Sequence, residues 1–138
     1  MKEEVKRRMD HTIVHFEIPA ADVGKLKAFY EGLFGWKIFK VPMEGMEYWL
    51  IYTVPTDEKG MLLKPGVNGG MFQKQAQQEG LKPVNYITIE NIDESFEKVG
   101  KLGGKILMPK QHVPTVGWVA LVVDPEGNQI GLLQPEQM

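Results

Sequence analysis

A similar corner sequence, Gly-x-Lys-Ile, occurs once in each half of this 138-residue chain. Gly35-Trp36-Lys37-Ile38 follows an amphipathic segment in the first half, and Gly103-Gly104-Lys105-Ile106 follows one in the second. A glycine directly after a segment of apolar period 3.6 ends a helix, and the apolar residues beyond it indicate a strand. The repeated corner therefore predicts two modules with the same plan.

The first half predicts a strand, a helix and three further strands. Their ranges are 12–19 for the first strand, 22–34 for the helix, and 36–41, 47–54 and 67–73 for the later strands. The helix has an apolar face at the helical period, made of Val23, Leu26, Tyr30, Leu33 and Phe34. The loop 55–66 is interpreted as a solvated turn, with a lid as the alternative.

The second half repeats the plan after a polar linker, 74–83. A strand is predicted at 84–90, and Asn91 with Glu94 has the spacing of a capping box that starts a helix. The expected buried face of that helix is Ile92, Phe96, Val99 and Leu102. A strand follows from 105 to 108 or beyond.

A hairpin is predicted at 117–133, because two apolar runs flank Asp124-Pro125-Glu126-Gly127-Asn128. In this turn Pro125 fixes φ, and Gly127 or Asn128 can adopt a positive φ. The second run contains Gly131, and a glycine inside a strand weakens it, so a specific role for Gly131 is expected.

These elements predict an α+β fold of two βαβββ modules, at 11–73 and 84–135, within one domain. The modules are expected to form a cupped, mixed, mostly antiparallel sheet with the helices outside and a cavity on the concave face. The alternative is that both sheet faces are buried in a core or a dimer interface. Residues 1–10 are expected to form an N-terminal arm.

Composition excludes several classes of function. Sixteen basic and eighteen acidic residues give a net charge of −2, without the basic clustering of a nucleic-acid site. No apolar run approaches the roughly 20 residues of a membrane span. The chain has no cysteine, so disulfide and thiolate chemistry is excluded and a cytoplasmic location is expected.

His15 and Glu17 are the candidate catalytic residues. They lie two apart on the first strand, so their side chains share a face, and an imidazole beside a carboxylate can perform acid–base chemistry. The alternative is a polar pair that orients a bound molecule or caps loop backbone.

The candidate ligand-binding residues are aromatic side chains and one glycine whose missing side chain would leave room for a ligand. They are Tyr48, Tyr52, Tyr86, His112, Trp118 and Gly131. Core packing is the alternative for the aromatic residues, and simple surface exposure is the alternative for His112.

Two other chemistries are not supported. The only serine, Ser95, lies within the second helix, away from any nucleophile elbow. The glycines at 66–70 lack the ending of a phosphate-binding loop. We expect them to let a strand bend or a neighbour approach closely.

Three motifs in order resemble the vicinal oxygen chelate superfamily, which includes glyoxalase I, bleomycin-resistance proteins and extradiol dioxygenases. They are Phe29-Tyr30-x-x-Leu33-Phe34-Gly35-Trp36, Leu102-Gly103-Gly104, and Asp124-Pro125-Glu126-Gly127-Asn128-x-Ile130. The resemblance covers about residues 12–134 and implies the fold. It does not specify an activity, because the superfamily includes isomerases, dioxygenases and non-catalytic drug binders.

The resemblance also implies where metal ligands would lie, on the first and last strands of each module. These positions fall on His15, on Val84, on Gly131 and on the strand near 67–72, which offers no carboxylate or imidazole. Because valine and glycine cannot coordinate a cation, no metal cofactor is expected.

The sequence therefore favours a homodimeric domain that binds a small organic ligand, the dimer being implied by the resemblance. Two alternatives remain open: an acid–base enzyme that uses His15 and Glu17, and a metal-dependent enzyme with non-standard ligands.

Overall fold

The computed structural model describes residues 9–114 and 116–136. Contacts divide the chain into two compact units, one of residues 13–86 and one of residues 87–138 with 1–12. The predicted N-terminal arm lies almost entirely outside the described residues. Neither described helix is long and apolar enough to cross a membrane.

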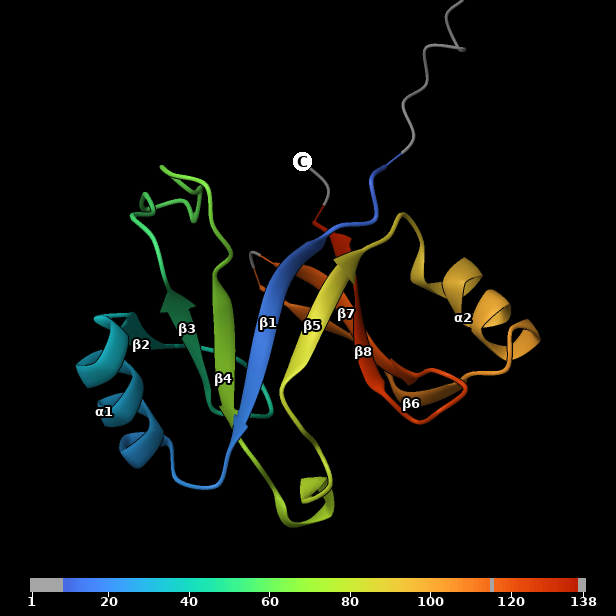
Figure 1. The fold of residues 1–138 in the computed structure, drawn as a ribbon, viewed down its shortest axis with the longest axis horizontal. Coiled ribbons are helices and arrows are strands. Elements are labelled where there is room, and N and C mark those ends of the chain that lie inside the picture. Colours follow the sequence, from blue (N-terminus) through green and yellow to red (C-terminus); the bar gives the residue numbers. More distant parts are fainter. Residues whose placement is uncertain (1–8, 115, 137–138) are drawn as a thin grey trace, which may run out of the picture. The chain divides into compact units, whose positions relative to one another are not determined.

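The unit of residues 13–86 contains one α-helix, a short 3-10 helix and a mixed sheet (Figure 1). Its elements are β1 (Ile13–Ala20), α1 (Val23–Phe34), β2 (Lys37–Val41), β3 (Tyr48–Tyr52), β4 (Gly69–Gln73), the short 3-10 helix η2 (Ala76–Gln78) and the first part of β5 (Val84–Thr88). The strand order is β2-β3-β4-β1-β5. β1 pairs with β4 in parallel, whereas the β2–β3 and β3–β4 pairs are antiparallel.

Local chemistry fixes both ends of α1. The Asp22 carboxylate accepts a hydrogen bond from the Lys25 backbone N–H, and Gly35 ends the helix with a φ of 73°. A left-handed φ is tolerated best by glycine, so the corner predicted at Gly35 forms for the expected reason.

The helix packs on one face of the sheet. The core beneath it consists of Ile18, Ala20, Val23, Ile38, Ile51 and Met71. Leu33 and Phe34 were expected on the buried face of α1, but more than half of each side chain is exposed. The Phe34 ring contacts those of Tyr30 and Trp36, which themselves pack against the core, so Phe34 lies at the edge of the core and not within it.

The second unit places α2 (Ile92–Lys101) against β6 (Lys105–Val113), β7 (Gly117–Val123) and β8 (Gln129–Pro135). The strand order is β8-β7-β6, and both pairs are antiparallel. The core under α2 contains Ile89, Ile92, Ala120, Val122 and Leu132, with Phe96 and Val99 packed against it. Leu102, expected in this core, is 75% exposed because it lies at the C-cap, beyond the last turn.

The β7–β8 hairpin forms the predicted turn. The Asp124 carboxylate accepts hydrogen bonds from the Asn128 side chain and from the backbone N–H groups of Asn128 and Glu126, and these bonds lower the pKa of Asp124. Gly127 takes the positive φ, 90°. The described elements thus confirm the predicted α+β class and the strand–helix–strand order of both halves.

Candidate functional site

The two faces of β1 carry different chemistry. Ile18 and Ala20 belong to the core beneath α1. Side chains alternate along a strand, so His15 and Glu17 lie on the opposite face. Both are buried, although each is polar.

Tyr48 reaches these two residues from β3, across the intervening strand β4. In the register of the sheet, Glu17 is opposite Gly70 on β4, and Gly70 is opposite Leu50 on β3. The Tyr48 hydroxyl occupies the space that a Cβ atom at Gly70 would take. Gly70 therefore permits the close approach of a neighbour, one of the two roles expected for the glycines at 66–70. The neighbour is the Tyr48 side chain.

Four side chains meet on this face and form what we call the buried acid cluster: His15, Glu17, Tyr48 and Tyr86. The Tyr48 hydroxyl donates to Glu17 Oε2 at 2.9 Å, and the Tyr86 hydroxyl donates to Glu17 Oε1 at 2.7 Å. His15 Nε2 lies 3.2 Å from the Tyr48 oxygen, and its ring contacts the Tyr86 ring edge-on. The structure thus brings together four of the predicted site residues.

Burial sets the charge preferences of the cluster. It lowers the pKa of His15 from 6.5 to about 4. Burial also raises the pKa of Glu17, and the hydrogen bonds from Tyr86 and Tyr48 oppose that rise. The pKa values of both tyrosines lie well above their usual range because of burial and the nearby Glu17 carboxylate. The imidazole is therefore neutral at pH 7.

The hydrogen bonds also define the tautomer of His15. A carboxylate only accepts hydrogen bonds, so with Glu17 ionised the single Tyr48 hydroxyl proton points to Glu17. The Tyr48 oxygen can then only accept from His15, which places the imidazole proton on Nε2.

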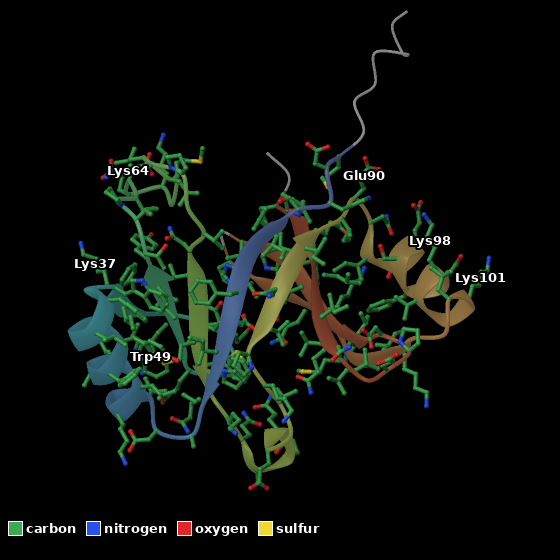
Figure 2. All side chains as sticks on the ribbon, viewed as in Figure 1. Lys37, Trp49, Lys64, Glu90, Lys98 and Lys101 are labelled. Atoms are coloured by element: carbon green, nitrogen blue, oxygen red, sulfur yellow. The ribbon has the colours of Figure 1, made fainter. Side chains whose placement is uncertain are left out.

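A cavity of about 430 Å³ lies at the far end of β3. It is lined by Gly35, Lys37, Tyr52, Thr53, Val54, Pro55, Thr56 and Leu63. By alternation Tyr52 shares a sheet face with Tyr48, and its ring packs edge-on against Phe39. Figure 2 shows the Lys37 side chain at the outer edge of this unit.

The loop 55–66 contributes part of the lining and has internal hydrogen bonds. The Asp57 carboxylate accepts from the backbone N–H groups of Lys59 and Met61, and Thr56 forms a bridge with Leu62. Of the cavity residues, only Tyr52 is among the ligand-binding candidates predicted from the sequence. The apolar run 61–63 was the available signal for Leu63.

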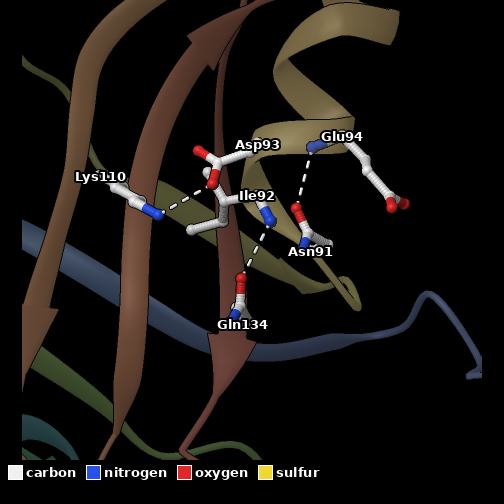
Figure 3. Close-up of polar contacts among 6 residues, drawn as sticks. All are labelled: Asn91, Ile92, Asp93, Glu94, Lys110 and Gln134. Atoms are coloured by element: carbon white, nitrogen blue, oxygen red, sulfur yellow. Dashed lines mark hydrogen bonds and ion pairs between the residues drawn. The ribbon is translucent and has the colours of Figure 1, made fainter.

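In the second unit, His112 and Trp118 lie together, opposite each other on β6 and β7. Their ring centroids are 5.0 Å apart, and His112 Nε2 lies 2.8 Å from Glu136. By alternation Trp118 shares the sheet face of Ala120, which packs under α2. Lys110 lies over the Trp118 ring and pairs with Asp93 at the start of α2 (Figure 3).

Gly131 is buried in β8, opposite Leu121 on β7. Its neighbour Leu132 packs under α2, so Gly131 is on the other face of the sheet. A role for Gly131, His112 or Trp118 in ligand binding stays a prediction.

The sequence pattern of the glyoxalase/bleomycin resistance protein/dioxygenase superfamily matches residues 12–132. The chain belongs to this superfamily. The match covers both units and all described helices and strands except the end of β8.

Similar proteins agree with the superfamily assignment. A protein of Mycobacterium tuberculosis (strain CDC 1551 / Oshkosh) described as putative glyoxylase CFP32 is 28% identical over 122 residues, which is 86% of this chain and 43% of that protein. The chain thus spans less than half of that relative. A glyoxylase-like domain-containing protein of Didymella fabae is 30% identical over 119 residues, covering 81% of this chain and 84% of the relative.

The fold is also similar to that of solved structures. A Streptomyces coelicolor methylmalonyl-CoA epimerase variant, solved with 2-nitronate-propionyl-CoA, superposes with a TM-score of 0.62 at 13% identity. The superposition covers 90% of this chain and 97% of the epimerase.

The residues at the usual metal positions of the superfamily do not fit a metal site. His15 Nε2 is hydrogen-bonded to Tyr48, and Val84 and Gly131 carry no donor atom. Within residues 9–114 and 116–136, no three His, Asp or Glu side chains gather as a ligand set. The donor set therefore gives no basis for a step through a metal.

Proposed function

We propose that this protein binds a small organic molecule on the sheet face opposite α1, without the superfamily's usual metal. The buried acid cluster carries the proposal. Glu17 is a buried carboxyl group that accepts hydrogen bonds from two tyrosine hydroxyls. No cation is among the groups that shift its pKa. Burying such a group costs free energy that an apolar core would avoid, and costs of this kind concentrate at functional sites.

Two further observations support ligand binding. The cavity next to Tyr52, about 430 Å³, has the size of small-molecule sites, which span roughly 300–1,000 Å³. The similar epimerase was solved with an acyl-CoA analogue bound, so this fold accommodates organic ligands. Tyr52 and Lys37 are proposed to contact the ligand through the ring face and the ammonium group.

A thermal-shift screen of small organic acids, aromatic compounds and acyl-CoA thioesters tests the proposal. We expect at least one compound to raise the melting temperature in the presence of EDTA. The shift should be reduced in both Glu17→Gln and Lys37→Gln, and retained in the exposed control Glu90→Gln. A full library without a shift for the wild-type protein would contradict the proposal.

Elemental analysis tests the metal-free part separately. We expect less than stoichiometric Fe, Mn, Ni and Zn in the purified protein. Near-stoichiometric metal that is lost together with ligand binding on chelation would overturn this part and favour a metal enzyme with non-standard ligands.

A second candidate function is acid–base catalysis, favoured by the contact chain from His15 through Tyr48 to Glu17. A neutral imidazole is a competent base, and Glu17 is a competent acid when its pKa is raised. Replacement by His15→Ala should abolish turnover of a bound compound. Unchanged affinity and unchanged turnover in this variant would remove the pair from any site.

We also propose that the protein is a homodimer, as the superfamily resemblance implies, and that it is cytoplasmic, as the absence of cysteine favours. Sedimentation equilibrium should give twice the chain mass of 15.6 kDa. A monomer mass across the micromolar range would contradict it.

A further inference from the structure

The buried acid cluster contains an unbroken path for a proton. His15 Nε2 contacts the Tyr48 oxygen, and the Tyr48 hydroxyl contacts Glu17 Oε2, at 3.2 and 2.9 Å. Each contact can be made with its proton on either side, because an imidazole, a hydroxyl and a protonated carboxyl can all donate and accept. The chain therefore has two complete arrangements of opposite direction.

We propose that Tyr48 is a proton relay between His15 and Glu17, so that these three side chains hold one exchangeable proton as a unit. The proposal deepens the acid–base candidate, and rests on that proposed function only for the use of the proton. The relay itself is a property of the protein without ligand.

The transfer balances at every atom. An incoming proton binds the lone pair of His15 Nδ1. The Nε2–H bond then breaks, and the Tyr48 oxygen takes the proton that was on Nε2. The original Tyr48 O–H bond breaks as Glu17 Oε2 takes its proton. His15 ends neutral with its proton on Nδ1, Tyr48 ends neutral, and the carboxylate has become a carboxylic acid.

No other titratable group interrupts the path within this unit. β1 contributes His15 and Glu17, β3 contributes Tyr48, and β4 contributes Gly69, Gly70, Met71, Phe72 and Gln73, none of which titrates. From β5 comes Tyr86, which holds the other carboxylate oxygen and contacts His15 only through the rings. Tyr86 is therefore a matched tyrosine outside the relay.

The arrangement is also consistent with the opposite pKa shifts of its two ends, lowered for His15 and raised for Glu17. Burial favours neutral forms of both groups, and a proton delivered to His15 neutralises Glu17 instead of leaving a buried imidazolium. Two groups linked in this way titrate together, so a measured midpoint belongs to the pair.

Two spectra test the relay in the apoprotein. Long-range ¹H–¹⁵N NMR of the three histidines reports the tautomer of His15, and the infrared carboxyl band reports protonation of Glu17, identified by its loss in Glu17→Gln. We expect the Nε2–H tautomer at every pH at which the infrared band shows Glu17 ionised, and the Nδ1–H tautomer where it shows Glu17 protonated. In the wild-type background, His15→Gln should shift the pH midpoint of the Glu17 titration by about one pH unit or more, because strongly interacting groups shift each other's titration by this amount.

The same His15→Gln substitution is then measured in Tyr48→Phe and in Tyr86→Phe. Both variants remove one hydroxyl from Glu17, but only Tyr48→Phe cuts the path. We expect the midpoint shift to vanish in Tyr48→Phe and to persist in Tyr86→Phe, each checked for a native spectrum. An equal shift in both variants, or an Nδ1–H tautomer in the wild-type protein at a pH where the infrared band shows Glu17 ionised, would overturn the relay. Neither result bears on whether a ligand binds.

Discussion

At the scale of single residues, a Cβ atom at Gly70 would overlap the Tyr48 hydroxyl. Gly70→Ala should therefore displace Tyr48 from Glu17 and destabilise the protein by about 1–3 kcal/mol, the usual cost of overpacking. Gly32→Ala, in α1 and with nothing within 4 Å, is the control and should stabilise by roughly 0.5–1 kcal/mol. Urea unfolding of both variants measures the difference. Equal stabilities would contradict the assigned role of Gly70.

His15 makes stability depend on pH. Its pKa falls from 6.5 to about 4 on folding, so the stability it contributes is fully present above 6.5 and is lost as pH falls toward 4. His15→Gln should remove up to about 3 kcal/mol of this loss, since each pKa unit corresponds to about 1.4 kcal/mol. Denaturation at pH 7.5 and 4.5 tests this, with the half-exposed His112→Gln as control. If the free energy of unfolding of His15→Gln fell between pH 7.5 and 4.5 by as much as that of the wild-type protein, the prediction would be refuted.

Glu17 makes stability depend on pH in the opposite direction. Its pKa is raised above the model-compound value of 4.5, so the folded state resists ionisation and stability decreases as pH rises above 4.5 toward the folded pKa. Glu17→Gln should therefore remove this decrease and be relatively more stable at neutral than at acidic pH, measured by the same denaturation series. A stability difference between Glu17→Gln and the wild-type protein that does not change with pH would contradict this assignment.

At the scale of elements, the start of α2 depends on two side-chain oxygens (Figure 3). Asn91 Oδ1 accepts the Glu94 backbone N–H at 3.0 Å, and Gln134 Oε1 accepts that of Ile92 at 3.0 Å. Asn91→Ala should cost about 1 kcal/mol, whereas Asn91→Asp keeps the acceptor and should cost little. Hydrogen exchange of the first-turn amides of α2 measures both. Equal protection in the two variants would contradict the cap.

The elements themselves were largely predictable because their signals are local. Asp22 and Gly35 bound α1, Asn91 starts α2, and Gly127 closes the hairpin turn, each through contacts within a few residues. Burial at helix ends was not predictable. Leu102 has the right spacing for the α2 face, but the helix ends before it.

At the scale of the whole molecule, the donor set predicts independence from metals. EDTA treatment should leave the melting temperature and ligand binding unchanged, because two of the usual ligand positions are Val84 and Gly131. Added Zn²⁺, Ni²⁺ or Mg²⁺ at micromolar concentration should give no saturable stabilisation. A saturable rise that Glu17→Gln or His15→Gln abolishes would show a metal site at the buried acid cluster.

The sequence by itself determined the order of the elements, the two-module plan and the superfamily. It also placed His15 and Glu17 on one face of a strand, because alternation is a property of a single strand. These features depend on residues that are neighbours along the chain.

Only the tertiary structure decided that Tyr48 and Tyr86 complete the cluster. They are 31 and 69 residues from Glu17, and they reach it because β4 lies between β3 and β1 while β5 lies on the other side of β1. Alternation states which side chains share a face of one strand, but not which strands are neighbours. Strand neighbours depend on contacts between residues far apart in the sequence, such as those that bury Ile18, Ile51 and Met71 of β1, β3 and β4 together under α1.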